Sequence, residues 1–74
     1  QLHAQLHKST VVATDEAVIK VTLDIVPDDD HPYAVLTAID EMGDQLAQER
    51  VAASFKLSPT SAAAWVESGF RAPR

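Results

Sequence analysis

The stretch QERVAASFKLSPTSAAAWVESGF, residues 48–70, decides the fold of this chain, because it is compatible with two secondary structures. Residues 48–57 either alternate in polarity along a strand or, being rich in alanine, form a helix. The second half predicts a helix in both cases, because Ser58 is a favourable N-cap, Pro59 suits the first helical position and Gly69 ends the segment. The fold therefore depends on the residues before Ser58.

Upstream of this stretch, the segment Val18–Val26, VIKVTLDIV, is the clearest strand in the chain. Every second residue from Ile19 to Ile25 is apolar and the residues between them include Lys, Thr and Asp, which is the period of a strand with one buried face. Residues 9–14, STVVAT, are also rich in β-branched side chains, and the acidic pair that follows them suits a short turn. These segments predict two antiparallel strands.

The segment 33–57 fits two patterns equally well. As helices, it has an apolar stripe between Val35 and Met42 that ends at Gly43. As strands, it alternates from residue 46 to residue 57, and residues 40–44 form a hairpin loop in which Gly43 is available for a positive φ. The local pattern alone does not choose between them.

Consistency along the whole chain favours strands. A lone hairpin is marginal in stability, whereas a meander covered by a helix closes one core with short connections. We therefore predict an α+β fold: a small antiparallel β-meander of three to four strands with one C-terminal α-helix packed on one face. We expect residues 1–74 to form a single domain, with residues 1–8 as a frayed end and 71–74 as a tail. The alternative fold is a β-hairpin followed by a tri-helical helix-turn-helix.

The alternative rests on a pattern that resembles the helix-turn-helix of phage-repressor-type regulators. Ala52 matches the small residue in the first helix, Phe55 the apolar residue three positions later, and Leu57 the apolar residue after the turn. Neighbouring inner positions are matched by Val51, Ala62 and Trp65. The resemblance implies a DNA-binding transcriptional regulator. The sequence departs from it at Lys56, where the turn usually has Gly, and on the outer face of the second helix, which has no Arg, Lys, Asn or Gln to contact bases.

Composition narrows the class of function. The chain of 74 residues has a net charge of −5, which disfavours nucleic-acid binding, and no apolar run long enough for a membrane span. It has no Cys and no visible signal peptide, so we expect a cytoplasmic location. Because it begins with Gln, we expect a processed product, a trimmed chain or a fragment.

Chemistry-bearing side chains are few. Residues 28–31, DDDH, form a dense cluster of ligand-type residues, but they lack the spacing, Gly and terminal Glu of a Ca²⁺ loop. His3 and His7 have helical i, i+4 spacing without a fixed set of further ligands. No Gly-rich phosphate loop, Cys nucleophile or nucleophile elbow is present. We therefore expect no metal, no cofactor and no catalytic function.

The remaining prediction is a protein-interaction module, such as an inhibitor, adaptor or subunit fragment. It would bind a protein partner, or itself as a dimer, through the open sheet face or an edge strand, because a one-layer sheet leaves both uncovered. The predicted interaction residues lie on the strands, outside the core: Val11, Val12, Lys20, Thr22, Asp24, Gln48, Arg50 and Ser54.

Overall fold

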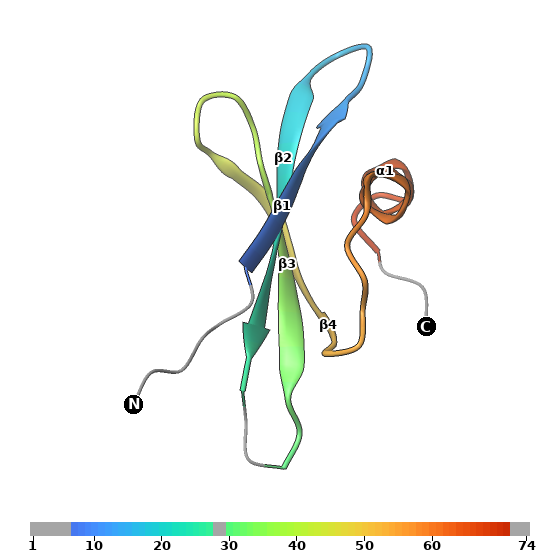
Figure 1. Cartoon of the computed structure of the whole chain (residues 1–74). Helices are drawn as coiled ribbons and strands as arrows, with labels where there is room; N and C mark the ends of the chain where they lie inside the picture. Colours follow the sequence, from blue (N-terminus) through green and yellow to red (C-terminus); the bar gives the residue numbers. More distant parts are fainter. Residues whose placement is uncertain (1–6, 28–29, 72–74) are drawn as a thin grey trace.

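The computed structural model describes residues 7–27 and 30–71, which form one antiparallel sheet and one helix (Figure 1). The elements are, in chain order, β1 (His7–Ala13), β2 (Val18–Val26), β3 (Tyr33–Ile39), β4 (Gln45–Ala52) and α1 (Pro59–Glu67). The strands lie in the order β1-β2-β3-β4, so every neighbouring pair is consecutive in sequence. The predicted α+β meander is confirmed, and the tri-helical alternative is wrong, because α1 is the single helix of the described residues.

Two tight turns connect β1 to β2 and β3 to β4. In the first, the Thr14 hydroxyl accepts hydrogen bonds from the backbone N–H groups of Glu16 and Ala17, at 3.2 and 3.0 Å. In the second, the Asp40 carboxylate accepts bonds from the N–H groups of Met42 and Asp44, each at 2.9 Å. Short polar side chains that satisfy nearby backbone donors favour such turns over continued strands. Gly43 in the second turn has a φ of 86°, as predicted.

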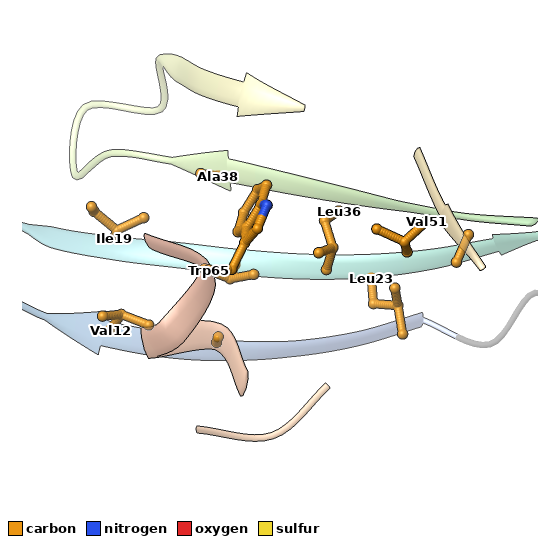
Figure 2. Packing of buried hydrophobic residues seen from close by; sticks show 10 residues of the cluster. Val12, Ile19, Leu23, Leu36, Ala38, Val51 and Trp65 are labelled. Atoms are coloured by element: carbon orange, nitrogen blue, oxygen red, sulfur yellow. The ribbon is translucent and has the colours of Figure 1, made fainter. Parts of the chain in front are cut away.

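The core lies between α1 and one face of the sheet (Figure 2). Its largest fully buried side chains are Val21 on β2, Leu36 on β3 and Trp65 on α1. The alternation predicted for β2 is confirmed, since Ile19, Val21 and Leu23 are buried and Ile25 packs against them. Apart from these, the buried apolar residues are Val12, Ala34, Ala38, Val51 and Ala62.

The strand predicted for residues 46–57 is too long, because β4 ends at Ala52. A turn follows, in which the Phe55 N–H donates to the Ala52 carbonyl at 3.0 Å. The chain leaves the sheet here because α1 packs against β1, at the opposite edge of the sheet, and the connection must cross the core face to reach it. Phe55 and Leu57 pack against the core from this connection rather than from a strand.

The helix begins directly after its predicted cap and ends at Glu67, two residues before Gly69. Ser58 is the N-cap, and its hydroxyl accepts from the Ser61 N–H at 3.1 Å while the Ser61 hydroxyl accepts from the Ser58 N–H at 2.9 Å, a reciprocal capping box. After Gly69 the chain turns back, and the Phe70 N–H donates to the Trp65 carbonyl at 2.8 Å. The two aromatic rings pack edge to face with centroids 5.3 Å apart.

Of the two predicted chain ends, residues 1–8 and 71–74, the structure describes residues 7, 8 and 71. β1 begins at His7, two residues earlier than the predicted strand, so the frayed end predicted for residues 1–8 does not extend to its last two positions. Residues 1–6 and 72–74 lie outside the described residues.

Candidate interaction surfaces

Three surfaces of the described residues are left open for a partner, and the first is the β1 edge. Its main feature is a row of backbone N–H and C=O groups that point away from the sheet. The Thr14 N–H donates to the Ala17 carbonyl on the β2 side at 2.8 Å, and the register continues with Val12 opposite Ile19. Hydrogen-bonded positions alternate along an antiparallel strand. The N–H and C=O groups of Ser9, Val11 and Ala13 therefore point away from β2. Among the described residues, no hydrogen bond joins these groups to another segment.

The side chains of β1 divide between the two faces of the sheet. Val11 lies on the open face and is 59% exposed, whereas Val12 lies on the core face and is 7% exposed. The predicted interaction residue Val12 is therefore a core residue that packs near α1 (Figure 2). Val11 is the side chain of this pair that a partner can reach.

The opposite edge, β4, differs from β1 in its regularity and charge. The β3–β4 register shifts between Ala38 and Ile39, so that Leu46 is an extra, bulged residue. Glu49 and Arg50 place two charges on the same strand. Bulges and charges are the usual means of preventing strand addition at an edge. β1 has neither Pro nor charge between Lys8 and Asp15, which leaves it as the less protected edge.

The third surface is the sheet face opposite α1, called here the open face. The register places five of the predicted residues on it: Lys20, Thr22, Asp24, Gln48 and Arg50. Ser54 is not among them, because it lies in the turn after β4. At the centre of the face, Thr22 is only 7% exposed, although none of the described helices or strands covers this face. Its neighbours across the strands, Ser9 and Thr37, flank it on both sides.

Two contacts on the open face were not predicted from the sequence. The Arg50 guanidinium lies over the Tyr33 ring, 3.8 Å from its centroid, in a cation–π contact. The Gln48 amide donates to the Thr37 hydroxyl at 3.4 Å. Both pairs join β3 to β4. Predicting them from the sequence would have required the β3–β4 register, because the register determines which residues of the two strands are neighbours. That register depends on the bulge at Leu46, which the alternation pattern does not show.

The ligand-type residues singled out in the sequence lie only partly within the described residues. Of the predicted ligand-type residues, His3, Asp28 and Asp29 lie outside them. Within residues 7–27 and 30–71, no three His, Cys, Asp or Glu side chains gather closely enough to hold a metal ion.

Comparisons with family models, with curated proteins and with solved structures gave no match. The helix of the described residues, α1, is too short and too polar to cross a membrane.

Proposed function

We propose that this domain is a non-enzymatic protein-interaction module that binds an extended polypeptide segment along the β1 edge. The supporting observation is the row of outward N–H and C=O groups at Ser9, Val11 and Ala13, which make no hydrogen bond within the described residues. In strand addition, such groups supply the affinity, and the alternate side chains supply the specificity. Val11, exposed beside them, is the apolar contact available to the partner.

The β1 edge supports binding better than the open face does. On the open face, the Arg50 guanidinium already stacks on Tyr33, and the Gln48 amide already bonds Thr37. A partner on that face would have to compete with these contacts. The outward N–H and C=O groups of β1 are hydrogen-bonded to water. A partner strand therefore replaces hydrogen bonds to solvent without breaking hydrogen bonds within the protein.

The remaining parts of the proposal rest on composition. Without Cys, a phosphate loop or a nucleophile elbow, the chain is better suited to binding than to catalysis. An acidic module of this size is suited to act as an inhibitor, an adaptor or a subunit fragment. We place it in the cytoplasm, in keeping with a sequence that has no Cys.

Selection of displayed short random peptides against the wild-type domain tests the proposal. Each recovered peptide is then measured against two variants by fluorescence anisotropy. Val11→Pro removes an outward N–H without removing a β1–β2 bond, and we expect it to abolish binding. Leu46→Lys places a charge on the other edge, and we expect it to leave binding unchanged. Peptides that bind Val11→Pro as well as wild type would place the site elsewhere and refute the proposal.

A further inference from the structure

We infer that the strand which occupies the β1 edge is β1 of a second copy of this chain, so that two sheets join about a two-fold axis at Val11. This inference rests on the proposed function of the β1 edge and names its partner. The supporting observation is the order of residues along β1, which is complementary to itself when read in the opposite direction. The charged residues at its two ends, Lys8 and Asp15–Glu16, are part of this order.

The alternation of the ladder restricts the register to pairings in which outward residues lie opposite outward residues. In an antiparallel pair, residues that exchange hydrogen bonds lie directly opposite each other. Among the symmetric pairings, the one centred on Val11 pairs Ser9, Val11 and Ala13 with one another. In it Val11 lies opposite Val11 of the second copy, and Ser9 lies opposite Ala13 at both ends. Since all three residues share one face of the sheet, the two-fold axis is perpendicular to the joined sheet.

The side chains suit this arrangement. Val11, 59% exposed in the single chain, is covered by its counterpart, and pairs of β-branched residues across strands stabilise sheets. On the core face, Thr10 lies opposite Val12. No two like charges face each other along the pairing from Ser9 to Ala13, because that segment contains no charged residue. The edge therefore contains no element that opposes its own copy.

Charge complementarity at the two ends favours a second copy over an unrelated strand. Lys8 precedes the apolar part of β1, and Asp15 and Glu16 follow it. The two-fold pairing places Lys8 opposite Thr14 of the second copy, next to its acidic pair. Both ends of the pairing thus bring one positive and two negative charges together. Lys8 is exposed, as are Asp15 and Glu16, so these groups are free to approach.

The pairing determines on which side of the joined sheet the two helices lie. Figure 1 shows β1 at the front of the sheet with α1 to one side of it, and α1 packs against β1. A two-fold axis perpendicular to the sheet places both helices on the same side, close to the axis.

Analytical ultracentrifugation over a range of concentrations tests the inference. Wild type is expected to dimerise, and Val11→Lys to raise the dimer dissociation constant about tenfold or more, because two like charges then face each other on the axis. Val11→Glu is expected to do the same. An equimolar mixture of these two variants should dimerise again, since opposite charges now meet. Val18→Lys is the matched control, because Val18 is 40% exposed on the neighbouring strand, outside the pairing.

A second measurement examines the register. The chain has no Cys, so a single introduced thiol reports only its own neighbours. Residues directly opposite each other in a hydrogen-bonded pair have Cα atoms about 5.5 Å apart, within the range of a disulfide. On mild oxidation, Val11→Cys should therefore form a covalent dimer rapidly. Val18→Cys should remain mostly uncrosslinked under the same conditions.

Three results would overturn the inference: a wild type that stays monomeric at high concentration, a mixture of the two charge variants that does not dimerise, or crosslinking that is faster at Val18→Cys. Each is distinguishable from failure of the proposed function. If selected peptides bind wild type but not Val11→Pro while the protein stays monomeric, the edge binds a strand and the second copy is not its partner. If no peptide binds through the edge and no dimer forms, both are wrong.

Discussion

The Trp65 indole N–H donates to the Glu49 carboxylate at 2.8 Å, which joins α1 to β4 across the core face of the sheet. The helix packs mainly against β1, at the other edge. This hydrogen bond therefore spans the sheet and helps hold α1 in its orientation. It also gives the buried indole N–H an acceptor, since Trp65 is only 1% exposed.

Removing the acceptor should destabilise the fold. We expect Glu49→Ala to lower the free energy of unfolding by about 1–3 kcal/mol, because it leaves a buried donor unsatisfied. Glu49→Gln keeps a side-chain oxygen at a similar position and should cost less. Urea denaturation followed by circular dichroism measures both. Repeating Glu49→Ala in a Trp65→Phe background, which has no indole donor, should give a smaller loss. Equal losses in the two backgrounds would contradict this role for the bond.

The capping box at the start of α1 gives a second prediction. Ser58→Ala should cost about 1 kcal/mol of stability, because it leaves the Ser61 N–H without its acceptor. Thr60→Ala changes an exposed residue of the same turn and should stay within about 0.5 kcal/mol of wild type. Thermal denaturation of the two variants side by side checks the difference. If Thr60→Ala were the more damaging change, the cap would not be the determinant of this helix start.

Binding to DNA gives a third prediction. The exposed residues of α1 include Thr60, Ala64 and Glu67, and the only charge among them is negative. Glu67 repels phosphates, and the chain as a whole has a net charge of −5. We expect no sequence-selective retention of genomic fragments in a low-salt filter assay. Selective retention that is lost with Thr60→Ala would show that α1 contacts DNA after all.

The sequence predicted β2 and the helix cap because each has a strong local signal. The apolar alternation of Val18–Val26 matches one buried face, and Ser58-Pro59 matches a helix start. The end of β4 was not predicted, because the alternation continues through Phe55 and Leu57 into the connection. There, the position of α1 over β1 determines where the strand stops, and that is a tertiary effect.

The candidate site was predicted less completely than the fold. The open-face residues follow from alternation, which is why Lys20 and Arg50 lie where expected. Val12 was misplaced because adjacent residues of β1 are both Val, so the pattern does not show which one faces the core. The Tyr33–Arg50 contact depends on the pairing of two strands, which local periodicity does not encode.

β3 shows the same difficulty and provides the last prediction. Its sequence, YAVLTAI, is almost continuously apolar, so its two faces cannot be told apart by polarity. In the structure the smaller Ala34 and Ala38 share the core face with Leu36, which is fully buried, while the adjacent Val35 is half-buried on the open face. Figure 2 shows Trp65 beside Ala38, so the large indole ring packs where the side chain of β3 is small.

Two neighbouring truncations should therefore differ sharply. We expect Leu36→Ala to cost about 2–5 kcal/mol, because it leaves a cavity beneath Trp65 that a sheet cannot readily close. A domain of this size rarely has more than about 3–5 kcal/mol of total stability, so this variant should be close to unfolding at room temperature. Val35→Ala removes a partly exposed side chain and should cost about 1 kcal/mol or less. Urea denaturation monitored by Trp65 fluorescence measures both. A larger loss for Val35→Ala would mean that β3 presents its other face to α1.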